Sequence, residues 1–437
     1  AHMLGAASFQ FNWGNTKRNP SVVVSGDLGC NQEGDSPLPL EAHTHLAMTP
    51  PDAAITTLIL ESTYGADARG RPSAEARRAQ LASEVRACAE GSGRLIIPAF
   101  AMQRTQAILY DLSYLFATQP DLPRVRVLLA SPLARRVNDV YGQWYGRTEL
   151  RPTRDGMVTK YANVNVTEAR QLGLRDDERG LFVDMVRVAL GVARRPESWS
   201  RHPNPIVRAW DCAFEVCPSF GDPEQLPKPA VIIASGGMGT GGTSEALLRR
   251  LLRRADTTVC FVGYCAAGTA GARLLEIAGI DASAREGVPG GLWPNENGVP
   301  ALRLSDVRAS IRRLDGYSGH AGPEALVQYA LNDAPDNRLG RTATADRVFL
   351  VHGDDRARAA LAERVRDAAR SWAAEGIPRA DKLRVEIPHR SLAWYDLDRG
   401  EWTTGDPGLE AARAEAMRLL EQGDVAGATA LLTRAQR

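Results

Sequence analysis

Short apolar runs recur along the chain, and most of them have the length of a β-strand. Between positions 66 and 312, four such runs are each followed by a turn and a stretch of helical character. The predicted strands cover 94–100, 126–130, 229–234 and 257–264, and the predicted helices cover 106–114, 133–144, 244–254 and 272–278. Continuous apolar runs are typical of strands that are buried on both faces. Strands that alternate with helices therefore predict an α/β domain with a mostly parallel sheet, covered on both faces.

Three further strands end at a side chain that can take part in chemistry. The run from Ser21 ends at Asp27, the run from Thr57 ends at Glu61, and the run from Arg347 ends at His352. In α/β proteins, functional side chains gather in the loops beyond the carboxyl ends of the strands. We therefore predict one site that contains the Asp, the Glu and the His. Because these strands lie on both sides of 66–312, the α/β domain is predicted to be an insertion.

The remaining segments give weaker patterns. Residues 150–228 are mixed polar with scattered Trp and Pro, and we expect helices and loops there. A hairpin is expected at 394–402, around Arg399 and Gly400. Two short amphipathic helices, 409–422 and 425–434, follow a break at 406–408. Their apolar faces could pack on the body of the protein or hold a partner subunit.

The composition is that of a globular protein, because 44% of the residues are hydrophobic and 24% are charged. The 53 Lys and Arg residues nearly balance the 52 Asp and Glu residues, so bulk charge neither indicates nor excludes nucleic acid as a partner. No apolar run approaches the roughly 18 residues of a membrane-spanning helix. The six cysteines are scattered and form no CxxC pair. They favour free thiols in a reducing compartment, and we expect a cytoplasmic protein.

Histidine is rare, with seven in the chain. His320 lies in Tyr317-Ser-Gly-His-Ala-Gly322, a turn of small residues that precedes a predicted helix at 323–331. The glycines let a phosphate approach closely, and the helix N-terminus favours an anion there. The alternative is a capping turn in which the histidine is incidental. His43 and His45 are separated by one residue, a spacing that a metal site could use. No acid or third histidine follows closely, so we expect a surface loop.

A glycine-rich turn, Ser235-Gly-Gly-Met-Gly-Thr-Gly-Gly242, follows a buried strand and precedes a helix. Its backbone N–H groups could converge on a phosphate oxygen, with the helix dipole behind them. The turn lacks the lysine of a P-loop and does not match GxGxxG, so a nucleotide cofactor is not indicated. A tight turn that only needs permissive glycines is the alternative.

Eight motifs follow one another in an order that is highly specific when they are taken together. They are Ala1-His-Met-Leu-Gly-Ala-Ala7, Ser25-Gly-Asp-Leu-Gly29, Glu61-Ser-Thr-Tyr-Gly65, Pro98-Ala-Phe-Ala101 with Arg104-Thr-Gln106, Ala234-Ser-Gly-Gly-Met238, Val262-Gly-Tyr264 with Gly268-Thr269, Ser318-Gly-His-Ala321 and Val351-His-Gly-Asp354. Over residues 1 to about 400 the chain resembles the β-CASP branch of the metallo-β-lactamase fold, the RNA-processing nucleases that include the cleavage-and-polyadenylation endonuclease.

The resemblance implies a domain organisation. It implies an α/β fold with a metallo-β-lactamase αββα core, whose N-terminal part is missing here, and an inserted Rossmann-like β-CASP domain. The core would occupy 1–65 and 313–400, and the β-CASP domain would occupy 66–312 and form an RNA cleft. A C-terminal helical hairpin is expected at 401–437.

The resemblance also implies roles for single residues. His2 resembles a metal-ligand histidine, Asp27 resembles the carboxylate that bridges two zinc ions, and His352 resembles a ligand of the second ion. Glu61 and His320 resemble an acid and a histidine that act beside the metals. The histidine at 320 would contact the scissile phosphate or protonate the leaving group.

Two zinc ions would supply the chemistry that hydrolysis of RNA requires. They lower the pKa of a bridging water and neutralise charge on the phosphate. Imidazole and carboxylate are suitable zinc ligands. Contacts to phosphates would position the RNA without reading its bases. The residues expected to make these contacts are Arg104, Ser235, Gly236, Gly237, Met238, Ser318 and Gly319.

The sequence departs from the family pattern at one point. The motif His-x-His-x-Asp-His, which normally precedes the residue that matches His2, is absent. We interpret this as truncation rather than loss. We therefore expect the chain as given to bind zinc weakly and to cleave nothing unless the missing part is restored.

The leading hypothesis is a zinc-dependent ribonuclease, endonucleolytic with or without exonuclease activity. RNA is the expected partner, a homodimer is one candidate assembly, and no membrane is involved. The alternative is a non-catalytic RNA-binding or scaffold relative, which the retained Glu61, His320 and His352 disfavour. A metallo-hydrolase for a small substrate is a third hypothesis, and the large inserted domain argues against it.

Overall fold

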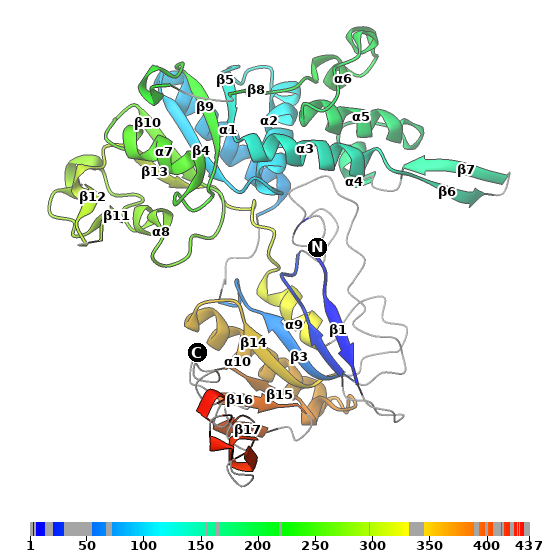
Figure 1. Ribbon diagram of the computed structural model, residues 1–437. Helices are drawn as coiled ribbons and strands as arrows, with labels where there is room; N and C mark the ends of the chain where they lie inside the picture. Colours follow the sequence, from blue (N-terminus) through cyan, green and yellow to red (C-terminus); the bar gives the residue numbers. More distant parts are fainter. Residues whose placement is uncertain are drawn as a thin grey trace. The chain divides into compact units, whose positions relative to one another are not determined.

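The computed structural model separates into two compact units (Figure 1). The large unit consists of Ala1–Ala6, Leu28–Thr44 and Arg69–Ala321, and the small unit consists of Ala7–Asp27, His45–Ala68 and Gly322–Arg437. The structure describes residues 3, 6–13, 21–29, 55–66, 72–153, 156–161, 166–217, 221–296, 298–331, 345–388, 393–397 and 401–404, with scattered positions between 412 and 431.

A six-stranded parallel sheet forms the centre of the large unit. Its strands lie in the order β13-β10-β4-β9-β5-β8, and each neighbouring pair is parallel. The strands are β4 (Arg94–Ala99), β5 (Arg126–Ala130), β8 (Glu215–Val216), β9 (Ala230–Ser235), β10 (Thr257–Phe261) and β13 (Ser310–Arg313). A parallel α/β sheet was predicted from the repeat of strands and helices, and this prediction is confirmed.

Helices cover both faces of this sheet (Figure 1). Alternate residues of one strand enter different hydrophobic clusters, because successive side chains of a strand point to opposite faces. Leu95 and Ile97 of β4 pack in one cluster, and Ile96 packs in the other. The first cluster includes residues of α1 (Ala74–Glu90), α2 (Arg104–Thr118), α3 (Pro132–Tyr145), α4 (Val166–Gln171), α5 (Arg179–Ala189) and α6 (Pro205–Ala209), and the second includes residues of α7 (Gly242–Leu251) and α8 (Ala270–Leu275).

The prediction of helices and loops over 150–228 needs a correction. A β-hairpin of β6 (Thr148–Thr153) and β7 (Gly156–Tyr161) occupies the start of this segment and projects from the part of the unit that holds α3, α4 and α5 (Figure 1). The sequence of β6 is Thr-Glu-Leu-Arg-Pro-Thr, which contains a proline and lacks the apolar alternation of a half-buried strand. A second hairpin, β11 (Gly291–Pro294) with β12 (Pro300–Arg303), lies later in the same unit.

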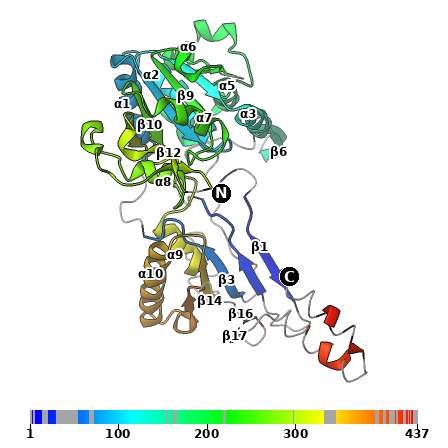
Figure 2. The same cartoon turned by 60° about the vertical axis from the view of Figure 1, so that its left-hand side comes forward.

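A five-stranded sheet organises the small unit, in the order β1-β2-β3-β14-β15. The first pair is antiparallel and the other pairs are parallel. The strands are β1 (Phe9–Asn12), β2 (Ser21–Val24), β3 (Ile55–Glu61), β14 (Ala345–Val351) and β15 (Arg384–Glu386). Helices α9 (Pro323–Leu331) and α10 (Asp355–Ala374) lie side by side against β14 (Figures 1 and 2). The edge strand β1 was not predicted.

The hairpin predicted at 394–402 is confirmed as β16 (Ala393–Asp396) and β17 (Glu401–Thr404). The rings of Tyr395 and Trp402 pack edge-on against each other and against Phe349 of β14. The turn at Arg399 and Gly400 lies outside the described residues. Beyond the hairpin, helical conformation is described at 412, 415–419, 425, 427 and 429–431, within the two predicted helices.

Two findings bear on the expectations from composition. Of the six cysteines in the sequence, the five that are described are free thiols, as expected. In the part of the chain that the structure describes, no helix has both the length and the apolar character of a membrane span.

A network of buried charges crosses the core of the large unit. Asp111 of α2 is fully buried and accepts hydrogen bonds from Nε of Arg77 and Nε of Arg78, both at 2.8 Å. The guanidinium of Arg78 also donates to Glu168. Burial alone would raise the pKa of Asp111, but the two guanidinium groups outweigh it and lower that pKa. The charged aspartate therefore stabilises the fold at neutral pH, and this contribution is lost as the pH falls through its pKa in the folded protein.

Replacing Asp111 with asparagine is expected to lower the free energy of unfolding by about 3 kcal/mol, because two buried guanidinium groups lose their compensating charge. Asp121→Asn is the control. Asp121 is 74% exposed in its ion pair with Arg86, so its loss should cost less than about 1 kcal/mol. Urea denaturation of both variants gives the comparison, and equal effects would contradict the structural role of the buried network.

Candidate metal centre

Parallel pairing in the small unit brings three strand ends to one edge of the sheet. Val24 of β2 pairs with Ile59 of β3, and Glu61 at the end of β3 pairs with Val351 at the end of β14. Asp27 and His352 follow directly beyond these ends. The register therefore places the Asp, the Glu and the His at the same carboxyl edge.

The turn that carries Asp27 depends on its two preceding residues. Gly26 has φ +58°, and a Cβ there would lie 2.7 Å from the carbonyl oxygen of Ala7, so glycine is required on both counts. The backbone N–H of Ser25 donates to the carbonyl of Ile59, and the backbone N–H of Glu61 donates to the hydroxyl of Ser25 at 3.1 Å. These bonds fix the end of β2 to the end of β3.

Ser62 and Thr63 fix the end of β3 to the loop that carries His352. The N–H of Ser62 donates to the carbonyl of His352 at 3.0 Å, and its hydroxyl donates to the carbonyl of Val351. The hydroxyl of Thr63 lies 3.0 Å from Nδ1 of His352, and the N–H of Thr63 donates to Oε2 of Glu61. A Cβ at Gly353 would lie 2.7 Å from the hydroxyl oxygen of Ser62, so the two loops approach closely.

His352 itself has φ +51°, in the left-handed region that residues other than glycine rarely adopt. A conformation of this kind costs on the order of 1 kcal/mol and persists where the surrounding structure holds it. The bonds from Ser62 and Thr63 hold it from one side. On the other side, Asp354 caps α10 by accepting from the N–H of Ala357 at 2.7 Å.

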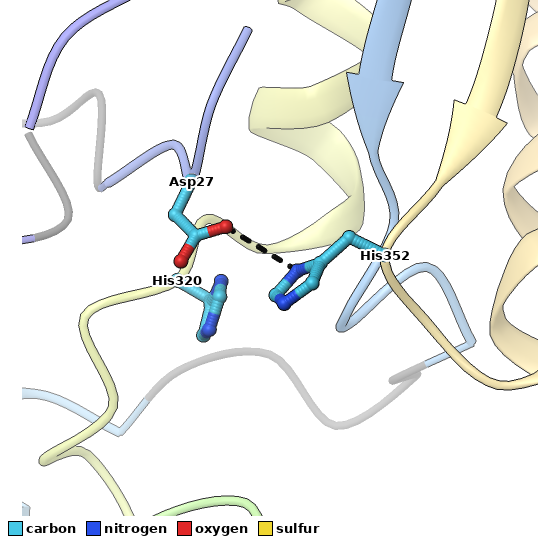
Figure 3. Close-up of side chains that lie close together, drawn as sticks. All are labelled: Asp27, His320 and His352. Atoms are coloured by element: carbon cyan, nitrogen blue, oxygen red, sulfur yellow. Dashed lines mark ion pairs between the residues drawn. The ribbon is translucent and has the colours of Figure 1, made fainter.

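His320 completes a group of three possible metal ligands (Figure 3). Asp27, His320 and His352 each offer one ligand atom, and these atoms all lie within 4.8 Å of one another. The N–H of Ala321, next to the histidine at 320, donates to the carbonyl of Leu28, next to the aspartate, at 2.8 Å. Two imidazoles and a carboxylate are donors that zinc accepts readily.

The carboxylates around His352 favour its protonated form. Oε2 of Glu61 lies 4.0 Å and Oδ1 of Asp27 lies 3.3 Å from its Nδ1. The interaction with Glu61 raises the pKa of His352 above its ordinary value of 6.5, partial burial opposes the shift, and the charge of Asp27 adds to it. Metal must displace this proton, because an imidazole nitrogen binds metal only when it is deprotonated.

The structure places the other predicted site residues as follows. Glu61 is almost fully buried at the end of β3. His2 lies outside the described residues, as do His43 and His45. Arg104 is buried at the start of α2, with its guanidinium carbon 5.5 Å from the centre of the Phe100 ring. Ser318 and Gly319 precede His320, and the hydroxyl of Ser318 accepts from the N–H of the histidine at 3.4 Å.

The glycine-rich turn after β9 is partly occupied by its own contacts. The N–H of Gly241 donates to the carboxylate of Glu245 at 2.6 Å, so an acid already lies at this end of α7. By contrast, the N–H groups of Gly236, Gly237 and Met238 donate to no acceptor among the described residues.

Sequence reasoning missed the hydroxyl groups that orient the site. Ser25, Ser62 and Thr63 lie inside the motifs around Asp27 and Glu61, but their types gave no indication of contacts to another strand. A signal was present in the position of Thr63, two residues after a strand-end carboxylate. Its partner, His352, is 289 positions away, and only the register of the sheet brings the two together.

The metal-free protein should show a His352 pKa above 6.5, because the neighbouring carboxylates stabilise the imidazolium ion. Glu61→Gln should lower that pKa, while Glu75→Gln, at the exposed start of α1, should leave it unchanged. A pH titration of the histidine ring signals by NMR measures all three. The stabilisation from this interaction is full below the unfolded-state pKa and is lost as the pH rises through the folded-state value. A His352 pKa at or below 6.5 would contradict the arrangement.

Two protein-family models match this chain. One, described as the "Beta-Casp domain", matches residues 105–274. The other, described as "Zn-dependent metallo-hydrolase RNA specificity domain", matches residues 305–375. The first match lies in the large unit and covers most of the six-stranded sheet. The second runs from the end of that unit through α9, β14 and α10.

Curated relatives agree with these matches. The chain is 26% identical to ribonuclease TTHA0252 of Thermus thermophilus, over 82% of this chain and 64% of the relative. It is 23% identical to transcription termination factor FttA of Methanothermobacter thermautotrophicus, over 81% of this chain and 44% of the relative. It is 32% identical to cleavage and polyadenylation specificity factor subunit 3 of Dictyostelium discoideum, over 42% of this chain and 22% of the relative. The chain thus spans less than two thirds of the length of each of the first two relatives.

The resemblance inferred from the eight motifs is therefore confirmed. The two models occur in the order that the sequence predicts, and the description of the second names a metal-dependent hydrolase. The chain belongs to the β-CASP branch of the metallo-β-lactamase fold.

Proposed function

We propose that this chain carries the metal centre of a zinc-dependent ribonuclease that hydrolyses RNA phosphodiester bonds. The observation that carries the proposal is the convergence of Asp27, His320 and His352, whose ligand atoms lie within 4.8 Å of one another. The names of two relatives, a ribonuclease and a cleavage and polyadenylation factor, support RNA as the substrate class.

The donor set fits zinc. One carboxylate and two imidazoles match the hard and borderline ligands of catalytic zinc sites, which keep a position open for substrate or water. When bound, zinc lowers the pKa of water and neutralises charge on a phosphate. We assign Asp27, His320 and His352 as ligands of one ion, which gives His320 a ligand role in place of the catalytic role that the family resemblance implies for it. A second ion, with His2 among its ligands, is part of the proposal and rests on the family resemblance.

Glu61 and Thr63 act on His352 in this proposal. The Thr63 hydroxyl and the Asp27 carboxylate both face Nδ1 of the ring, which fixes its orientation. Glu61 is outside the ligand group, and its Oε2 lies 4.0 Å from the same nitrogen, where its charge favours the protonated ring. Such orienting partners typically change metal affinity by about 10- to 100-fold.

The large unit supplies candidate contacts to RNA at the carboxyl edge of its sheet. The N–H groups of Gly236, Gly237 and Met238 have no acceptor among the described residues, and successive N–H groups of this kind bind phosphate oxygens. Ser318 and Gly319 stay in the proposal as further phosphate contacts. Arg104 also stays in the proposal as a phosphate contact. Because its guanidinium lies over the Phe100 ring, it would in addition hold that ring in place.

Phe100 is the side chain that best supports binding of single-stranded nucleic acid at the carboxyl edge of this sheet. Its ring remains 38% exposed, although Arg104 covers it and a Cβ at Gly237 would lie 2.8 Å from its Cδ2. Tyr264 follows β10, the neighbour of β4, and is exposed to a similar extent. Exposed aromatic rings that are held in place stack on unpaired bases.

His352→Ala should lower zinc-dependent RNA cleavage by more than about 100-fold, because losing a ligand costs more than losing a residue that only orients one. The assay uses labelled RNA and protein expressed from the whole natural reading frame, with and without chelator. His202→Ala, a partly buried histidine of the large unit, is the control. Cleavage that resists chelation would contradict the zinc mechanism, and zinc binding without any cleavage would favour the non-catalytic alternative.

Phe100→Ala should weaken binding of single-stranded RNA by about tenfold, because one stacked base contributes about 1–3 kcal/mol. Fluorescence anisotropy with a labelled oligonucleotide measures the affinity. Phe9→Ala removes an equally large ring that is 60% exposed on β1 and serves as the matched control. Equal loss in both variants, or no loss at Phe100, would show that stacking at this edge is absent.

A further inference from the structure

The segment from Asp315 to Ala321 leads from the last strand of the large unit's sheet to His320. Helix α1 holds the start of this segment. The N–H of Asp315 donates to Oε1 of Gln80 at 3.2 Å. Gly316 has φ +88°, and a Cβ there would lie 3.0 Å from Cγ of Pro72 and 3.3 Å from Cβ of Arg77. The backbone therefore lies directly against the first turn of the helix.

Tyr317 anchors the same segment in the buried charge network. Its side chain is fully buried, and its hydroxyl donates to Oδ2 of Asp111 at 3.0 Å. The guanidinium carbon of Arg77 lies 5.2 Å from the centre of the Tyr317 ring. Because Asp111 is itself held by two arginines at 2.8 Å, the hydroxyl is attached to a fixed point of the core.

A second attachment lies four residues further on. The N–H of Ala321 donates to the carbonyl of Leu28 at 2.8 Å. Only Ser318, Gly319 and His320 separate the two attachments, and the hydroxyl of Ser318 accepts from the N–H of His320. A stretch this short, held at both ends, leaves the histidine backbone little freedom.

We propose that Tyr317 and Asp111 are positioning residues for His320, because they fix the backbone of the turn that carries its imidazole. The proposal rests on the metal centre proposed above and assigns it a support inside the inserted domain. In this view the buried network does more than stabilise the core, because it also fixes the turn that carries one proposed ligand.

The chain offers a closely matched control. Tyr110 is also fully buried, lies in the same network, and donates its hydroxyl to a carboxylate, that of Glu168, at 3.1 Å. Its hydroxyl does not hold the segment that carries His320. A merely structural role for the network predicts the same outcome for Tyr317→Phe and Tyr110→Phe, whereas positioning predicts different outcomes.

The first test measures zinc affinity of the whole chain by competition with a chromophoric chelator. Tyr317→Phe should weaken zinc binding by about tenfold, the effect typical of a lost orienting partner. Tyr110→Phe should change it by less than about twofold. In a His320→Ala background, Tyr317→Phe should have no further effect, because a positioning residue acts only through the group that it positions. The proposal would be overturned if the two tyrosine variants lost zinc affinity equally. It would also be overturned if Tyr317→Phe lowered zinc affinity as much in the His320→Ala background as in the wild-type chain.

The second test needs no metal and separates this proposal from the proposed function. With ¹³C-labelled histidine, the ring signal of His320 is assigned by its absence in His320→Ala. Tyr317→Phe should shift or broaden this signal, and Tyr110→Phe should not. If the wild-type chain binds no zinc but the signal still responds, the metal centre fails and the positioning stands. If the signal does not respond to Tyr317→Phe, the positioning is wrong whatever the zinc result.

Discussion

The parallel pairing of β2, β3 and β14 is the constraint on which the candidate site depends. Parallel strands end at one edge, and the observed register leaves Asp27, Glu61 and His352 within one or a few residues of that edge. A shift of a strand by one residue would turn its side chains to the opposite face and separate these groups. The hydroxyl bonds of Ser25, Ser62 and Thr63 cross between the strand ends and reinforce the register where the chemistry is placed.

Sequence patterns were sufficient for much of this architecture, for a physical reason. Strands buried on both faces consist of continuous apolar residues, so a polar residue at the end of such a run is conspicuous, as Glu61 is after Leu58–Leu60. The strand–helix repeat likewise predicted the six-stranded sheet. The β6–β7 hairpin was missed because its polar strands lack that contrast. The periodicity of apolar residues also does not predict the grouping of His320 with Asp27 and His352. That grouping depends on hydrogen bonds between segments that are hundreds of residues apart.

Buried charged side chains have two different surroundings in this protein. In the large unit, Asp111 and its arginines are fully enclosed, so every charge has a partner inside the core. At the edge of the small unit's sheet, Glu61 is enclosed while His352 is 54% exposed. An enclosed carboxylate beside an open imidazole allows the imidazole to exchange protons or accept a metal while its orientation stays fixed.

The left-handed backbone at position 352 bears on how related copies of this protein diverge. Glycine adopts such a conformation without strain and asparagine tolerates it well, whereas histidine does so at a cost in stability. A duplicate that no longer needed the imidazole would therefore gain stability by drifting to one of those residues. A copy that carries glycine at this position would keep the turn and lose the imidazole, so the residue at 352 shows directly whether a copy retains this proposed ligand.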